Sequence, residues 1–261
     1  MGVRAGDAGP EGGVVPGDLL VPAGEACVLW RVSVEGTATV EDGGRLSLGA
    51  GGVEGDVTAG PAASVLLTDG TTVYGGIAGR GAEVRVDDSV VVGDVTLAER
   101  GGLVVHDSSF SGSLTGEVRE WALAGSVVAG DVDLRSWVSG DLGTSYVAGS
   151  VTMRRGLQHV VQSAVQGHLT SDLAEQVRMC TSEVGGNLKV KNSRTDVVHV
   201  GASVGPLDAC YDDGDNPLDV TVGGSAWFMD NRHSVLLGTL TVAGDLGCWG
   251  NTGPRGSCRR P

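Results

Sequence analysis

The sequence is dominated by an internal repeat, in which an apolar residue, any residue, glycine, any residue and an apolar residue follow one another every 18 to 20 residues. The repeat glycines stand at positions 36, 55, 75, 93, 112, 130, 149, 167 and 186, followed by a Pro206 variant and then by Gly224 and Gly244. Self-similarity at a fixed period is typical of solenoids, in which each repeat packs only against its neighbours. This feature constrains the fold more than any other.

One repeat, Glu83–Ala98, shows what each coil contains. Apolar residues alternate with polar ones at Val84 and Val86 and again at Val95 and Leu97, which is the period-two pattern of half-buried strands. No window has sustained helical spacing, and helical solenoid repeats are longer, about 33 residues or more. The glycine column indicates either a turn with positive φ or a close approach of stacked backbones. The repeats therefore predict an all-β parallel β-helix (solenoid) of about twelve coils, counting Pro206 as a glycine equivalent.

A second column of small or hydroxyl-bearing residues lies four positions before each glycine. It contains Gly51, Thr71, Ser89, Ser108, Ser126, Ser145, Ser163, Ser182 and Ala202. We expect these hydroxyls to bond to the local backbone or to the next coil. Because the serines are equivalent and none has a paired histidine, they do not indicate a catalytic nucleophile.

A third column, three positions after each glycine, faces outward in this register. It reads Thr39, Thr58, Ala78, Thr96, Thr115, Asp133, Thr152, Thr170 and Lys189. Threonine is favoured at exposed strand positions, and Asp133 and Lys189 interrupt the array. The column therefore indicates an ordinary exposed face rather than an ice-binding one.

The expected domain organisation is a flexible segment at residues 1–13, a β-helix with its N-terminal cap at 14–247 and a cysteine-bearing cap at 248–261. Cys248 and Cys258 flank a short loop after the last repeat and are the candidate disulfide, which favours an oxidising compartment. The five cysteines are an odd number. The pairing of Cys27, Cys180 and Cys210 stays open.

The net charge of −14 argues against binding to a nucleic-acid backbone, because phosphate would be repelled. No stretch approaches the ~20 apolar residues that span a bilayer. Met1–Gly13 lacks the apolar core of a signal peptide. The expectation is therefore either a cytosolic protein or a leader outside this sequence.

The repeat pattern resembles bacterial right-handed parallel β-helix repeat proteins, many of them secreted and of uncharacterised function. The resemblance lies in the recurring L-x-L-x-x-S-x-V-x-G-[DN]-V-x-L phrase, and in the ending Gly244–Thr252, which is similar to their closing phrase. It implies a right-handed coil and says nothing of activity, because function resides in sites rather than in folds. A more distant likeness is to bactofilins, bacterial cytoskeletal polymers with a related coil. The cysteine-bearing ends here look more like caps than polymer contacts.

Two groups of residues are candidates for a site. Asp208, Asp212, Asp213 and Asp215 form an acidic run with the oxygen ligands that calcium prefers, although their spacing matches no calcium motif and favours a solvated loop. Trp137 and Trp227 are expected at loop or outward positions, where indole rings stack on sugars, whereas Trp121 is expected in the core. The five histidines are dispersed, which argues against a metal site.

The absence of a convergent catalytic set favours a non-enzymatic, rigid scaffold or adhesion-type binding protein outside the cell or in the cell envelope. Its expected partner is a polysaccharide or an envelope component, without nucleic acid, a membrane span or a cofactor; the oligomeric state stays open. One alternative is a carbohydrate-active enzyme or a carbohydrate-binding β-helix that uses the acidic loop with calcium. Another is a bactofilin-like cytoplasmic polymer.

Overall fold

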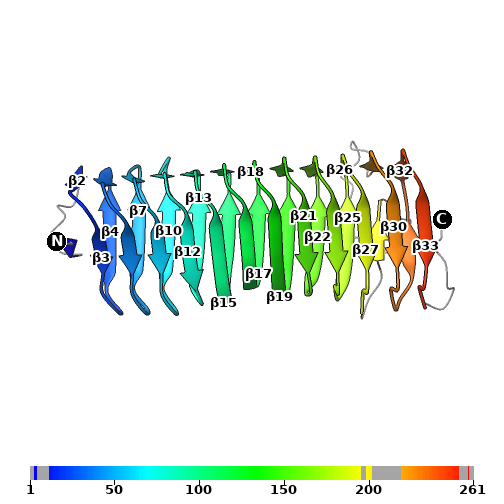
Figure 1. Ribbon diagram of the computed structural model, residues 1–261, viewed down its shortest axis with the longest axis horizontal. Helices are drawn as coiled ribbons and strands as arrows, with labels where there is room; N and C mark the ends of the chain where they lie inside the picture. The colour runs from blue at the N-terminus through cyan, green and yellow to red at the C-terminus, as the bar shows by residue number, and fades with distance from the viewer. Residues whose placement is uncertain (1–2, 5–11, 195–197, 202–218, 253–257, 259–261) are drawn as a thin grey trace, which may run out of the picture. The chain divides into compact units, whose positions relative to one another are not determined.

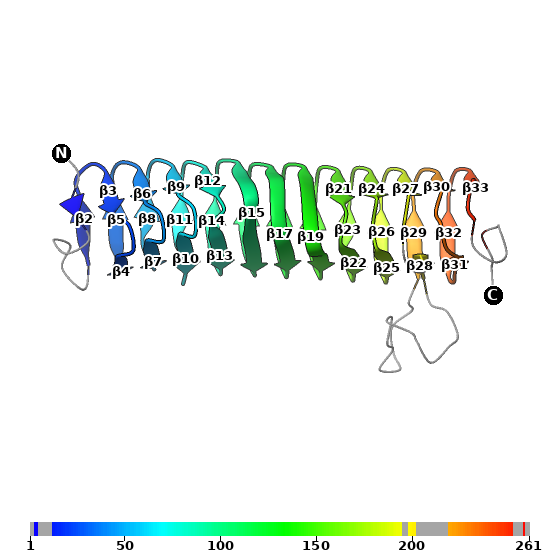
Figure 2. The ribbon, with the colours of Figure 1, turned by 90° about the horizontal axis from the view of Figure 1, so that it is seen from below.

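The computed structural model describes residues 3–4, 12–194, 198–201, 219–252 and 258. The fold is an all-β parallel solenoid of about 11 turns, without helices in the described residues, as the repeat predicts. The chain divides into two compact units, Met1–Asp131 and Val132–Pro261, named unit 1 and unit 2 below. Figures 1 and 2 show how successive strands stack within each unit.

Each turn has three faces. The first-face strand begins two residues after the repeat glycine, the second-face strand follows it, and the short third-face strand leads to the next glycine. In unit 1 the first face contains β3 (Leu19–Val21), β6 (Ala38–Val40), β9 (Val57–Ala59) and β12 (Ile77–Arg80). The second face contains β4 (Ala26–Trp30), β7 (Arg45–Gly49), β10 (Ser64–Thr68) and β13 (Glu83–Asp87).

Two long strands of unit 1, β15 (Val95–His106) and β17 (Leu114–Ala124), run over both the first and second faces. The third face contains β2 (Gly13–Val15), β5 (Val32–Val34), β8 (Gly52–Val53), β11 (Thr72–Val73), β14 (Val90–Val91), β16 (Ser109–Phe110) and β18 (Val127–Val128). The short β1 (Val3–Arg4) pairs with β3.

Unit 2 repeats this arrangement. Its β19 (Val132–Gly143) spans two faces; the first face continues with β21 (Val151–Arg154), β24 (Leu169–Asp172), β27 (Leu188–Lys191), β30 (Ala226–Met229) and β33 (Leu246–Trp249). The second face continues with β22 (Leu157–Val161), β25 (Gln176–Cys180), β28 (Val198–Val200) and β31 (Val235–Leu237). The third face contains β20 (Tyr146–Val147), β23 (Ala164–Val165), β26 (Ser182–Val184), β29 (Val220–Val222) and β32 (Leu240–Val242).

The core is built from apolar columns that the parallel register aligns. Val65 of β10 lies between Leu46 and Val84 in the ladder, and all three side chains are buried. Alternate residues of the same strands point to solvent, as pleating requires. Trp121 is buried in this core, as the sequence predicts. Each buried Val or Leu contributes about 1.5–3 kcal/mol to folding.

The repeat glycines mark close contact between stacked backbones rather than positive φ. A Cβ on Gly93 would lie 2.6 Å from the carbonyl carbon of Gly75 and from the nitrogen of Gly76. The Gly93 N–H donates to the Gly75 carbonyl at 2.9 Å, and Gly55 donates to Gly36 in the same way. Of the two explanations left open by the sequence, close approach is therefore the correct one.

The prediction of a separate coil at Pro206 is wrong, because the turn that contains Gly224 stacks directly on the turn that contains Gly186. The Gly224 N–H donates directly to the Gly186 carbonyl at 2.9 Å, and Val184 pairs with Val222. A proline has no N–H to donate at this column, whereas Gly224 has one. Residues 202–218 lie outside the described residues, and the ladder has about 11 turns instead of twelve.

Sharp corners between the second and third faces use left-handed backbone in residues other than glycine. Asp88, Asp107, Thr144 and Gln162 have φ between 44° and 50°. Each directly precedes a serine of the second repeat column. The corner thus places that serine inside the turn, where its hydroxyl can reach backbone groups.

Candidate functional site

The serine column is a buried structural ladder. The Ser108 hydroxyl donates to the His106 carbonyl at 2.7 Å and accepts from the Ser89 N–H at 3.1 Å. The Ser163 hydroxyl donates to the Val161 carbonyl at 2.8 Å, and unit 2 therefore repeats the pattern. These contacts are the backbone bonds that the sequence predicts, and they occupy the hydroxyls.

A second ladder uses the residue that follows each repeat glycine. The Asp94 carboxylate accepts from the Ser113 N–H at 2.7 Å, and the Ser113 hydroxyl accepts from the Asp131 N–H at 3.1 Å. In unit 2 the His168 Nδ1 accepts from the Asn187 N–H at 2.9 Å. The aspartate, serine and histidine side chains at this position therefore accept hydrogen bonds from backbone N–H groups of the next coil.

Unit 2 contains an asparagine ladder that the sequence analysis missed. Asn231 is fully buried; its Oδ1 accepts from the Ser193 N–H at 3.0 Å, and its Nδ2 donates to Asn251 Oδ1 at 3.0 Å. Asn251 in turn donates to the Phe228 carbonyl at 3.0 Å. The spacing of 20 residues between the two asparagines was a usable signal.

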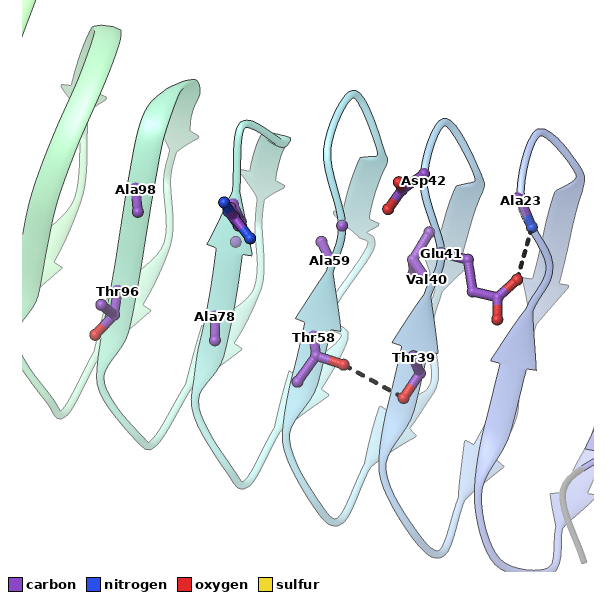
Figure 3. Close-up of a pocket in the computed structure, with 13 residues that line it drawn as sticks. Ala23, Thr39, Val40, Glu41, Asp42, Thr58, Ala59, Ala78, Thr96 and Ala98 are labelled. Carbon is purple, nitrogen blue, oxygen red and sulfur yellow. Dashed lines mark hydrogen bonds between the residues drawn. The ribbon is translucent and has the colours of Figure 1, made fainter.

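The clearest concave surface is an outward groove of about 710 Å³ on the first face of unit 1 (Figure 3). The surface of the groove is mostly apolar and comes from small residues, with a few polar ones, of strands β6 to β15 and adjoining turns: Ala23, Thr39, Val40, Glu41, Asp42, Thr58, Ala59, Gly60, Ala78, Gly79, Arg80, Thr96 and Ala98. The Thr58 hydroxyl donates to that of Thr39 at 3.3 Å. The groove thus runs along part of the threonine column.

The walls of this groove carry charge. The Glu41 carboxylate accepts from the Ala23 N–H at 3.0 Å, and Arg80 pairs with Glu99 at 2.6 Å (Figure 3 labels Glu41 and Ala23). The hydrogen bond and charge of Glu99 raise the pKa of Arg80, and Arg80 lowers the pKa of Glu99. Because Arg80 is engaged by Glu99, the groove offers hydroxyls and carboxylates more than an open positive charge.

Outward residues of unit 2 form ion pairs across neighbouring coils. Arg154 pairs with Asp133, and His159 Nδ1 lies 2.7 Å from an Asp141 oxygen. These pairs are partly exposed, and exposed pairs of this kind contribute about 0–1 kcal/mol each. Within the described residues, the other ring nitrogen of His159, Nε2, is buried and has no hydrogen-bond partner, so no serine or cysteine nucleophile contacts this pair.

The two candidate tryptophans do not come together. Trp137 lies within β19, partly buried, with the Arg155 guanidinium 4.6 Å from its ring centroid. Arg155 therefore occupies one face of that ring. Trp227 points outward from β30, next to Lys189 in the ladder. Strands β21, β24 and β27 lie between these two positions on the first face.

The acidic candidates Asp208, Asp212, Asp213 and Asp215 lie outside the described residues, and their calcium site stays a prediction. Within the described part of the chain, no group of three or more His, Cys, Asp or Glu residues could hold a metal ion. The same part has no helix with the length and apolar character needed to cross a membrane.

The structure joins Cys248 to Cys258 by a disulfide with a Cα–Cα distance of 5.9 Å, at the pair singled out in the sequence. Cys180 is also disulfide-bonded. Cys27 is a free, buried thiol whose pKa is raised by burial. It lies in the core of the first turn of unit 1 and reaches no site.

Comparisons with protein families, with curated proteins and with solved structures give no match.

Proposed function

We propose that this chain is a non-enzymatic β-solenoid that presents its first face to an extended, hydroxyl-rich ligand such as a polysaccharide. The groove of unit 1 carries this proposal. It repeats small outward side chains once per coil, at Thr39, Thr58, Ala78 and Thr96, so a polymer can lie along it without steric obstruction. Threonine hydroxyls and wall carboxylates provide donors and acceptors for sugar hydroxyls.

The ladders support a non-catalytic role. Serine, histidine and aspartate side chains that could perform chemistry instead hold backbone groups of adjacent coils, as at Ser108, His168 and Asp94. A rigid, preorganised surface lowers the entropic cost of binding an extended ligand. By the sequence resemblance, we place the chain with bacterial secreted right-handed parallel β-helix repeat proteins, acting outside the cell or in its envelope.

The test is binding of neutral polysaccharides, measured by calorimetry, with and without a block in the groove. Ala78→Trp fills the floor of the groove and is expected to abolish binding. Ser109→Trp adds the same ring at an exposed third-face position of unit 1 and should leave binding unchanged. If both variants bind the polysaccharide with the affinity of the parent chain, the groove is not the binding site.

A release assay for reducing sugar ends tests the enzymatic alternative. Turnover that Asp213→Ala abolishes would contradict the non-enzymatic assignment. Calcium calorimetry on the parent chain tests the associated metal prediction directly, because a calcium site must produce heat or compete with a calcium dye.

A second candidate function is end-to-end assembly of the bactofilin kind, which the last turn of unit 2 favours. Leu246 occupies the inward position that is fully buried at Leu188 and Ala226, yet it is 39% exposed. An exposed apolar side chain on a terminal strand favours pairing with another chain. Electron microscopy of the purified protein, compared with Leu246→Glu, tests this candidate: filaments lost in the variant support it, and particles without filaments in the parent chain exclude it.

A further inference from the structure

Unit 2 carries the only two lysines of the sequence, and both lie on one strand. Lys189 and Lys191 belong to β27, where they alternate with the fully buried Leu188 and Val190. Alternation places both lysines on the outward side of the first face. Sixteen arginines supply the rest of the chain's 18 basic residues, so this pair of lysines is a local feature.

Two tryptophans lie beside the lysines. Trp227 is the ladder partner of Lys189, and Gly247 is the next residue in that column. A Cβ on Gly247 would lie 2.9 Å from Trp227 Cδ1 and would also meet the Trp249 ring. Both indoles therefore lie over the bare backbone at Gly247, and Trp249 is 49% exposed. Figure 1 shows the three strands concerned, β27, β30 and β33, in succession.

Lys189 is the cation of this surface that favours an anionic ligand. Lys191 pairs with Asp172 at 3.1 Å, and Asp172 also accepts from Asn192 at 2.8 Å. Lys189 lies between Thr170 and Trp227 in the ladder and has no ion pair within the described part of unit 2. Its ammonium group is thus available to an incoming carboxylate. Asp230 directly follows β30 and Asp245 directly precedes β33.

We propose that the outward face of β27, β30 and β33, the lysine–tryptophan surface, binds an acidic polysaccharide whose sugars carry carboxylates. The apolar face of a uronate ring would stack on Trp249 and Trp227, and its carboxylate would accept from Lys189. Indole rings combine a large apolar surface with a polar N–H, and ammonium–carboxylate hydrogen bonds are among the stronger polar contacts. A ligand with a flat ring and one carboxylate per ring uses both parts of the surface.

This surface is separate from the unit 1 groove. The inference rests on the proposed function only in treating the solenoid as a binding scaffold. The two can be distinguished, because Ala78→Trp should abolish binding of a neutral polysaccharide and leave binding at the lysine–tryptophan surface intact. If the parent chain binds oligogalacturonate but no neutral polysaccharide, that result contradicts the binding role of the unit 1 groove and not the role of the lysine–tryptophan surface.

The experiment is calorimetric titration of the full chain with oligogalacturonate at low ionic strength, with neutral dextran and inorganic polyphosphate as comparison ligands. In the Ala78→Trp chain, whose unit 1 groove is blocked, oligogalacturonate is still expected to bind, and dextran is not. Lys189→Gln should weaken binding about tenfold, the effect of losing one charge-assisted hydrogen bond. Added salt should weaken it as well.

Matched variants separate stacking from a general effect of tryptophan. Trp249→Ala should also reduce affinity about tenfold, the order of a lost aromatic contact. Trp30→Ala removes a 38%-exposed indole that covers Gly49 in unit 1, far in sequence from any lysine, and should leave affinity unchanged. Thermal unfolding of each variant shows whether the last strand survives Trp249→Ala; Lys189→Gln is solvent-facing and serves as the test if it does not.

Several results would overturn the proposal. These are no binding of oligogalacturonate to the parent chain, equal binding of polyphosphate, or unchanged affinity in Lys189→Gln. Equal losses in Trp30→Ala and Trp249→Ala would also assign the binding to something other than this surface.

Discussion

The first face of the solenoid has the same backbone in the two units but very different outward side chains. In unit 1 the outward column contains Thr39, Thr58, Ala78 and Thr96, whereas unit 2 has Lys189 and Trp227 in that column. Residues 1–131 contain 7 basic and 19 acidic residues, and residues 132–261 contain 11 and 13, giving net charges of −12 and −2. The fold therefore constrains which residues occupy the inward and ladder columns, and it leaves the outward column free to vary. Ligand preference is therefore expected to differ between the units although their scaffold is shared.

The largest expected effect tests the shared scaffold. Gly93→Ala in unit 1 and Gly186→Ala in unit 2 should each lower the free energy of unfolding by about 3 kcal/mol, because overpacking against rigid backbone is costly. A Cβ at Gly186 would lie 2.6 Å from the Gly167 carbonyl oxygen, much like the contact at Gly93. Urea unfolding followed by circular dichroism measures both.

Gly70→Ala is the control for these two variants. Gly70 has a φ of +77° and nothing within 4 Å of an added Cβ. Only backbone strain applies there, at about 1 kcal/mol. If Gly93→Ala costs no more than Gly70→Ala, close backbone approach is not the reason for the glycine column.

The next effect distinguishes the units. Asn231→Ala should destabilise unit 2 by about 2–3 kcal/mol, since it leaves the Ser193 N–H and the Val190 carbonyl without their buried partner. Hydrogen exchange, read by mass spectrometry, should show the loss of protection in peptides of unit 2 and little change in unit 1. A uniform loss over both units would mean that they unfold as one cooperative body.

A smaller effect is expected from the serine ladder. Ser108→Ala should cost about 1 kcal/mol, because one neutral hydrogen bond is lost and the buried Ser89 N–H loses its acceptor. Ser109→Ala, at the exposed neighbouring position, is the matched control and should be within about 0.5 kcal/mol of the parent chain. Equal melting temperatures for the two variants would remove the structural role assigned to the column.

The strands and the core could be predicted from the sequence because inward positions repeat at a fixed period. Val84, Val86, Val95 and Leu97 alternate as strands must, and they are buried. The coil at Pro206 was predicted wrongly because its apolar pattern matches the repeat, while the ladder requires an N–H that proline lacks. The apolar pattern of a sequence does not show whether each ladder position has a backbone N–H to donate.

The candidate surfaces were less accessible to sequence reasoning. Outward columns obey no period, so the groove of unit 1 emerges only when Thr58, Ala78 and Thr96 are placed on adjacent coils. The lysine–tryptophan surface joins Lys189 to Trp227 across 38 residues, because the ladder omits one predicted coil. If Pro206 is counted as a coil, Lys189 and Trp227 are placed one turn further apart, and their direct pairing is not predicted.

The smallest expected effect concerns the charge that lines the unit 1 groove. The Arg80 guanidinium lowers the pKa of Glu99 below its ordinary value of 4.5, and the Thr37 N–H and hydroxyl lower that of Asp18 below 3.8. A carboxylate with a lowered folded-state pKa stabilises the fold above its unfolded-state pKa, and the contribution is lost as pH falls through the folded-state value. Arg80→Gln should therefore return the Glu99 pKa toward 4.5 and leave Asp18 unchanged. Carbon-13 NMR titration of side-chain carboxyls between pH 2 and 6 measures both groups (~4 pH units around the ordinary carboxyl values). An unaltered Glu99 titration in Arg80→Gln would mean that Arg80 does not pair with Glu99 in solution. Arg80 would then be the free cation of the groove, and the groove would share the anion preference assigned to unit 2.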